Sequence, residues 1–278
     1  MKKRHIFLII VFFVGIIFVS APAQACTLFG AQGSQYVAGG GTLLVKNRDW
    51  HPQEQRVLLR TDRGRYRFYG LYGGPKGKRR LCGGVNERGL AVVSAAASSI
   101  PRAKRLALPH QGRMSQLLAN CASVDEALRA CQGMTGLRFL MLADATELVV
   151  MEVGRDGQQR VKRVQQGTLA HTNHYLEPDF VSLNENYWPS SHQRYDRITA
   201  LLAEGSKPFS LEDMIRFSQD QTAGPDNSLW RTGSKVKGTQ TLATLAFHLR
   251  AGQAPEIYIK YRREPDEQGD ERVERLHF

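Results

Sequence analysis

A cysteine stands where an export signal would end. Cys26 directly follows Ala-Gln-Ala at residues 23–25, a small-x-small tripeptide typical of a signal-peptidase cleavage site. Cleavage after Ala25 would make Cys26 the first residue, with a free α-amine beside its own thiol. An α-amine titrates at about 7.7–8.0, so it can act as a general base near neutral pH. Because a thiolate is a strong nucleophile, one residue would then hold both nucleophile and base.

The segment before Cys26 has the parts of a signal peptide. A basic head, MKKRH, precedes the apolar run IFLIIVFFVGIIFV and the small residues SAPAQA. We expect signal peptidase to remove residues 1–25 and leave the protein periplasmic or secreted. An uncleaved membrane anchor is the alternative, because the apolar run is long for a signal. Lipid attachment to Cys26 is disfavoured, since Ala23 replaces the aliphatic residue that a lipoprotein signal needs and the bulky, polar Gln24 follows it.

The composition limits the partners and cofactors. The net charge is +12 and falls by three when the leader is removed, and small basic clusters lie at PKGKRR and PRAKR. No nucleic-acid motif or interleaved aromatic residue accompanies them, so we expect a solvated basic surface or attraction for anionic substrates or an anionic membrane surface. Neither metal-like His and Cys spacing nor a phosphate-binding glycine loop occurs, so we expect no metal and no cofactor. A homo-oligomer is allowed.

Three further cysteines leave the disulfide pattern open. Cys121 and Cys131 flank a predicted helix whose length would hold them too far apart for a direct bond. A bond from Cys82 to either of them is compatible with an exported protein. A sizeable core makes such a bond unnecessary.

The elements that must position Cys26 alternate between strands and helices. Strand patterns occur at residues 27–32, 41–47, 56–61, 66–72, 83–96, 138–154, 159–175, 239–252 and 254–263, and helical patterns at 113–132, 190–205 and 210–221. Tight turns are expected at Asn86–Gly89 and at Asp144–Ala145. Ser123 and Glu126 form a predicted capping box. Since no linker or repeat interrupts residues 26–278, we expect a single α+β domain built on antiparallel sheets.

Five segments in this order resemble a known family. They are CTLFG, GGGTLLVKNRDW, GGVNERGLAVV, LAHTNHY and SSHQRYDR. Together they resemble the N-terminal-nucleophile (Ntn) cysteine hydrolases, the group that includes choloylglycine hydrolases, penicillin V acylases and isopenicillin N acyltransferase-like enzymes. The resemblance covers most of residues 26–260. It implies a four-layer αββα sandwich.

The resemblance also implies roles for individual residues. Cys26 matches the nucleophile, Asp49 the carboxylate that holds its amine and thiol, and Asn173 the side-chain donor of the oxyanion hole. Arg194 matches the active-site arginine, with Arg197 as the alternative. Lys46 stands where the choloylglycine branch usually has an arginine and is expected to contact substrate. Lysine keeps the charge there but loses the bidentate geometry, which argues against recognition of bile-salt-type substrates. His174 is expected to be structural, because an N-terminal nucleophile brings its own base.

The sequence therefore predicts an exported cysteine amidohydrolase. It would cleave a linear N-acyl amide of a small molecule through a thioester on Cys26. An acyltransferase that passes the acyl group to an amine is an alternative. A non-catalytic, exported binding protein on the same fold and a disulfide-stabilised structural domain are the others.

Overall fold

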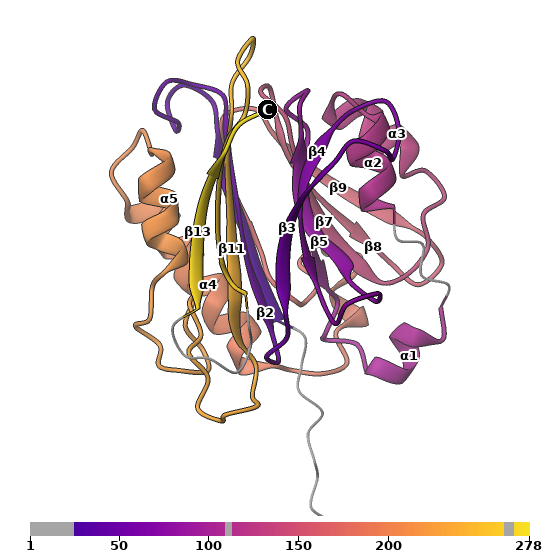
Figure 1. Ribbon diagram of the computed structural model, residues 1–278. Coiled ribbons are helices and arrows are strands. Elements are labelled where there is room, and N and C mark those ends of the chain that lie inside the picture. Colours follow the sequence, from indigo (N-terminus) through magenta and orange to yellow (C-terminus); the bar gives the residue numbers. More distant parts are fainter. Residues whose placement is uncertain (1–24, 109–112, 264–269) are drawn as a thin grey trace, which may run out of the picture.

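Two antiparallel sheets pack face to face in the computed structural model, which describes residues 25–108, 113–263 and 270–278 (Figure 1). The first sheet contains β1 (Ala25–Gln32), β2 (Thr42–Trp50), β10 (Gly167–His171), β11 (Gln240–Leu249), β12 (Glu256–Arg262) and β13 (Glu271–Leu276). Its strand order is β10-β1-β2-β11-β12-β13. Strand β1 therefore pairs with its sequence neighbour β2 on one side and with the distant β10 on the other.

The second sheet follows the chain order. Its strands are β3 (Gln55–Arg60), β4 (Phe68–Gly73), β5 (Arg80–Asn86), β6 (Ala91–Ala96), β7 (Arg138–Ala143), β8 (Leu148–Val153) and β9 (Gln159–Val164). Each strand pairs with the next, as local hairpins do. The chain then crosses from β9 in this sheet to β10 in the first. That crossing brings the segment after β10 beside the start of β1.

Helices cover the outer face of each sheet (Figure 1). The helices are α1 (Arg102–Leu106), α2 (Met114–Asn120), α3 (Val124–Ala130), α4 (Pro189–Glu204) and α5 (Leu211–Ser218), with a 3-10 turn η1 at Val181–Leu183. Alternate residues of a strand face opposite sides: Leu28 joins the core between the sheets, whereas Phe29 packs with Ile198 of α4 and Met214 of α5. Helices α2 and α3 pack in the same way on the second sheet. The predicted α+β, four-layer αββα arrangement is confirmed.

Most predicted elements are present, with small differences. The hairpins at Asn86–Gly89 and at Asp144 occur as expected. The Ser123 hydroxyl accepts a hydrogen bond from the Glu126 N–H at 3.3 Å. The Glu126 carboxylate bonds the N–H of Ala122 at 2.7 Å, so the predicted capping box forms with its second bond one residue earlier. Neither α1 nor β13 was predicted.

The four cysteines are free thiols, so the optional bond from Cys82 does not form. In the described part of the chain, no helix combines the length and the apolar character needed to span a membrane. The predicted signal peptide lies outside the described residues except for Ala25. It stays a prediction, as does the single-domain boundary at residue 26.

Candidate active site

The pairing of β1 with β2 fixes the surroundings of Cys26. Cys26 lies opposite Arg48, and Ala25 lies opposite Asp49. Because faces alternate along a strand, the Cys26 and Arg48 side chains share the face toward the second sheet. Asp49 points to the opposite face, toward helix α4. The peptide bond between Ala25 and Cys26 therefore lies beside a carboxylate on one face and a thiol on the other.

Asn173 contacts the backbone nitrogen of the nucleophile. The Cys26 N–H donates to Asn173 Oδ1 at 2.8 Å. Asn173 follows β10, which pairs with β1, so a residue 147 positions away in sequence lies next to Cys26. Its Nδ2 donates to the carbonyl of Ala96 at 2.9 Å, and its own N–H donates to Ser191 Oγ at 3.0 Å. These bonds fix the plane of the amide group.

Arg194 reaches Cys26 from helix α4. Its side chain is buried, and Nη1 donates to the Cys26 carbonyl at 2.7 Å and to Thr27 Oγ1 at 2.8 Å. Nη2 donates to Asn173 Oδ1 at 3.0 Å. Burial, which is opposed by the charge of Asp49 and assisted by the like charge of Arg231, lowers the pKa of Arg194 to about 10. The guanidinium therefore remains protonated at neutral pH and supplies a fixed positive charge at the nucleophile.

Asp49 is fully buried and only partly satisfied. Oδ1 accepts a hydrogen bond from Thr241 Oγ1 at 2.8 Å. Oδ2 lies 3.9 Å from Arg194 Nη1 and accepts no hydrogen bond from any described residue. Buried polar atoms are rarely left in that state. Asp49 therefore presents an unused acceptor next to the Ala25–Cys26 bond.

Lys46 and Arg197, the remaining candidates, lie outside the cluster around the Cys26 backbone. The Lys46 ammonium lies between the sheets and donates to the carbonyls of Cys82 at 2.7 Å and Ser94 at 2.6 Å. It connects the two sheets on the same face as Cys26, and its contact with substrate stays a prediction. Arg197 forms an ion pair with Asp220 at 2.5 Å. Of the two candidate arginines, Arg194 is the one bonded to Cys26.

His174 belongs to a network that supports Asn173. Its Nδ1 lies 2.9 Å from Ser191 Oγ and 3.2 Å from Thr172 Oγ1, and its ring stacks on His192 at 3.9 Å between centroids. Burial lowers the pKa of His174 to about 3, with the nearby histidines and Arg194 contributing. The imidazole is therefore neutral. These contacts suit a structural role in joining α4 to the Asn173 segment.

A cavity of about 290 Å³ borders this cluster. Its lining contains Ala25, Ser98, Asn173, Trp188, Ser190, Ser191, Arg194, Asp226, Arg231, Ser234, Lys235, Gly238 and Thr239. The residue before Cys26 thus forms part of its wall. A small molecule in this cavity would lie next to Asn173 and Arg194.

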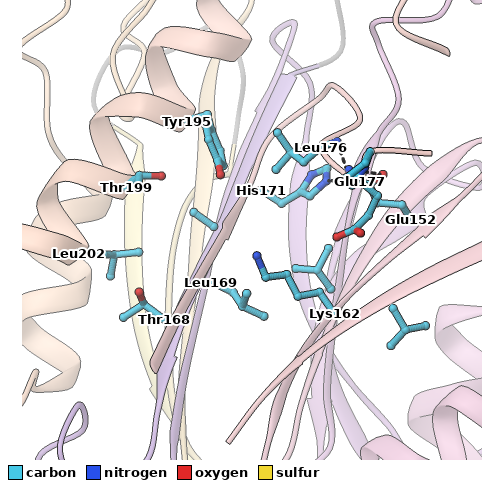
Figure 2. Close-up of a pocket in the computed structure, with 14 residues that line it drawn as sticks. Glu152, Lys162, Thr168, Leu169, His171, Leu176, Glu177, Tyr195, Thr199 and Leu202 are labelled. Atoms are coloured by element: carbon cyan, nitrogen blue, oxygen red, sulfur yellow. Dashed lines mark hydrogen bonds and ion pairs between the residues drawn. The ribbon is translucent and has the colours of Figure 1, made fainter. Parts of the chain in front are cut away.

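A larger cavity of about 510 Å³ lies elsewhere, between β8, β9, β10 and α4 (Figure 2). Glu152 and His171 meet there at 2.8 Å, and Glu152 Oε1 also accepts from the N–H of Leu176 at 2.8 Å. None of the catalytic candidates lines this cavity. It therefore carries no argument about the chemistry at Cys26.

Sequence reasoning missed several residues near Cys26. Thr241 holds Asp49, and Ser191 holds Asn173. Arg48 shares the face of Cys26, and its Nε donates to Cys82 Sγ at 2.8 Å. The two-residue period of a strand would have placed Arg48 on the face of Cys26. Arg231 had no such signal, because it lies in an irregular segment.

Comparison with known proteins assigns the family. The family model for acyl-coenzyme A:6-aminopenicillanic acid acyl-transferase matches residues 37–259. The chain belongs to this family. The matched range includes Asp49, Asn173 and Arg194, whereas Cys26 precedes it. No curated protein matches the chain significantly.

Solved structures of Ntn hydrolases share the fold of this family member. A mutant of the conjugated bile acid hydrolase from Clostridium perfringens aligns with a TM-score of 0.56 and 14% identity, over 91% of this chain and 92% of that one. The Caenorhabditis elegans ortholog of N-acylethanolamine-hydrolyzing acid amidase aligns with a TM-score of 0.54 and 16% identity, over 84% and 99%. The resemblance to Ntn hydrolases is confirmed. The chain is an enzyme of the Ntn amide hydrolase and acyltransferase class.

Clusters of metal-ligating side chains are absent from the part of the chain that the structure describes. No group of three or more His, Cys, Asp and Glu side chains there could hold a metal ion. The candidate chemistry consists of a thiol, a buried carboxylate, a carboxamide and a guanidinium. These are the groups needed for acyl transfer through a thioester.

Proposed function

We propose that this protein is an exported cysteine amidohydrolase whose active site is completed when residues 1–25 are removed. The observation that carries the proposal is the buried Oδ2 of Asp49, which accepts no hydrogen bond from the described residues. Asp49 lies opposite Ala25, so cleavage after Ala25 would create an α-amine beside this oxygen. The N–H groups of the amine, and of the ammonium that forms when it takes the thiol proton, are donors that this buried oxygen needs. The same cut gives Cys26 its own general base.

The proposed reaction begins with proton transfer from the Cys26 thiol to its α-amine. The sulfur then attacks the carbonyl carbon of a linear N-acyl amide. Asn173 uses one Nδ2 hydrogen for Ala96, and its second hydrogen is available for the oxyanion. The intermediate collapses to a thioester as the departing amine takes the proton from the Cys26 ammonium. Water then hydrolyses the thioester and releases the carboxylic acid and the thiol.

Acyl transfer is the second candidate, and the family description favours it because the matched model is that of an acyl-transferase. In this case an amine attacks the thioester in place of water. Both outcomes use the same acyl-enzyme. Adding a primary amine during turnover and measuring amide product against free acid separates them. An enzyme that forms free acid at every amine concentration is a hydrolase.

The activation step is tested by the mass and N-terminal sequence of the protein recovered after export. The expected first residue is Cys26. Any other first residue defeats the proposed activation. A blocked or acylated Cys26 that forms no thioester adduct with acyl substrates would instead indicate the lipid-anchored or binding alternatives.

Substitution of the nucleophile tests the chemistry. Cys26→Ala should abolish turnover without changing the thermal unfolding midpoint, and Cys26→Ser should leave a slow enzyme at best. The panel of compounds to be tested as substrates contains bile acid conjugates, penicillin V, acyl-homoserine lactones, acyl amino acids and short peptides. A thioester adduct on Cys26, seen by mass spectrometry, identifies the acyl group. Turnover that survives in Cys26→Ala would overturn the proposal.

A further inference from the structure

Arg231 carries a buried charge that forms no direct ion pair with any residue that the structure describes. The residue is 8% exposed and lies between α5 and β11. Its backbone is held on both sides, since its N–H donates to Thr241 Oγ1 and its carbonyl accepts from the Thr241 N–H, each at 2.8 Å. No described residue forms a hydrogen bond or ion pair with the guanidinium, and its buried Nε has no partner. Buried arginines are normally paired, so this one calls for an anion.

Arg231 belongs to the wall of the 290 Å³ cavity beside Asn173. Two further cations, Arg194 and the exposed Lys235, line the same cavity. Among the described residues of that lining, Asp226 is the one carboxylate. Its Oδ1 accepts the N–H of Ser234 at 3.0 Å and its Oδ2 accepts the Ser234 hydroxyl at 2.5 Å. These hydrogen bonds lower the pKa of Asp226, and the charge of Arg231 contributes to lowering it although the two side chains form no ion pair. The cavity therefore keeps an excess of positive charge.

The two buried guanidinium groups also repel each other. The charge of Arg231 acts with burial to lower the pKa of Arg194. Arg194 has partners that hold it in place, namely the Cys26 carbonyl, Thr27 and Asn173. An anion bound to Arg231 would relieve this repulsion and form charge-assisted hydrogen bonds. A carboxylate suits the planar fork of the arginine donors.

The position of the cavity indicates which half of a substrate would carry the anion. Ala25 lines the cavity and is joined through its peptide bond to the nitrogen of Cys26. When residues 1–25 leave, the space of Ala25 joins the cavity, which then borders the new α-amine. The departing nitrogen of the substrate must lie near that amine to receive its proton. The cavity is therefore on the side of the leaving amine.

We propose that Arg231 binds a carboxylate on the amine half of the substrate, so that the enzyme prefers N-acyl amino acids to neutral amides. This inference rests on the proposed cleavage at Cys26. It makes Arg231 a specificity-determining residue. The acyl half remains outside the cavity that Arg231 lines.

The first test compares two substrates that differ in charge at one group. An N-acylglycine and the corresponding N-acylglycinamide share the acyl chain, which is chosen as the one cleaved fastest in the substrate panel. The enzyme should show a higher kcat/KM for the glycine conjugate. Arg231→Met should lower kcat/KM for the glycine conjugate by about 10- to 100-fold and change that for the glycinamide by less than about threefold. Arg231→Lys should recover part of the loss.

The matched control is Lys237→Met, which removes the same charge from the same segment at an exposed residue outside the cavity lining. It should leave the ratio of the two substrates unchanged. Turnover of the glycinamide by Arg231→Met shows that the variant folds. If that variant does not fold, Arg231→Lys carries the comparison. Equal preference in the wild type, or a preference that survives in Arg231→Met, overturns the inference but leaves the amidohydrolase proposal standing.

The second test needs no amide substrate. Cys26 in the processed enzyme is alkylated with iodoacetate or with iodoacetamide, and the modified peptide is quantified by mass spectrometry. The ratio of the iodoacetate rate to the iodoacetamide rate should fall about threefold or more in Arg231→Met and stay constant in Lys237→Met. An unchanged ratio in both variants counts against an anion site beside Cys26. Loss of turnover for every amide, with this ratio still dependent on Arg231, would mean that the proposed function fails while the anion site stands.

Discussion

The buried pair of Asp49 and Arg194 offers a quantitative test of the site. The carboxylate is fully buried, the guanidinium is 1% exposed, and the nearest atoms are 3.9 Å apart. Replacing one member leaves the other as an unpaired buried charge, which costs about 3–5 kcal/mol of unfolding free energy. We therefore expect losses of that size for Asp49→Asn and for Arg194→Met. The double variant buries neither charge and should lose less than the sum.

The difference between the double variant and the two single variants measures the coupling. Arg194 also donates to the Cys26 carbonyl and to Thr27. These bonds are absent from the Arg194→Met variant and from the double variant alike, so their contribution cancels when the four proteins of the double-mutant cycle are compared. Contacting residues couple by about 0.5–3 kcal/mol, and burial places this pair toward the upper part of that range. The measurement is urea-induced unfolding, and the slope of the unfolding free energy against urea concentration should be the same in all variants. Losses that add within about 0.5 kcal/mol would show that the two charges do not interact.

Three further predictions concern single residues. Asn173→Ala should lower kcat by about 10²- to 10³-fold because it removes an oxyanion donor, and steady-state rates that fall less than about fivefold would contradict that role. His174 is neutral in the fold, with its pKa lowered from 6.5 to about 3, so the unfolded chain binds its proton first and stability falls as the pH drops from 6.5 toward 3. His174→Asn should reduce this loss of stability, measured as the urea midpoint at a series of pH values. A pH dependence equal to that of the wild type would contradict the assignment to His174. Lys46→Met should lower the unfolding free energy by about 1–3 kcal/mol, because the carbonyls of Cys82 and Ser94 lose their donor; a raised KM at unchanged stability would instead support contact with substrate.

Local patterns in the sequence were enough to predict most strands and helices. The hairpin at Asn86–Gly89 illustrates why: strand alternation flanks a turn that ends in a glycine with φ of +86°, a backbone conformation that glycine adopts easily. Strand β13 was missed for an equally local reason. Its residues ERVERL are mostly charged and exposed, and it exists because β12 offers it a partner at the edge of the sheet.

The active site was predictable only in part. Asp49 lies in the hairpin that begins at Cys26, so their proximity follows from local pairing. Asn173 lies beside Cys26 because β10 crosses to the first sheet, and only family resemblance could indicate that. The same resemblance favoured Arg194 over Arg197, and the structure has Arg194 bonded to Cys26. Arg231 could not be found from sequence, because the absence of a hydrogen bond from its Nε to any described residue depends on how an irregular segment packs.

The surroundings of Ala25 constrain when the proposed cleavage can occur. Ala25 is 4% exposed and lies within β1, paired with Asp49 of β2. The N–H of the bond to be cut donates to Asn173. A peptidase needs an accessible, extended segment, which a strand held in a folded sheet does not provide. The cut must therefore precede the docking of β1 between β2 and β10, as it would if signal peptidase acted on a chain that folds after export. Under the proposed function, the new α-amine would then meet Asp49 and Asn173 when β1 docks, and the contacts around the Ala25–Cys26 peptide in the described structure would become those that hold the amine.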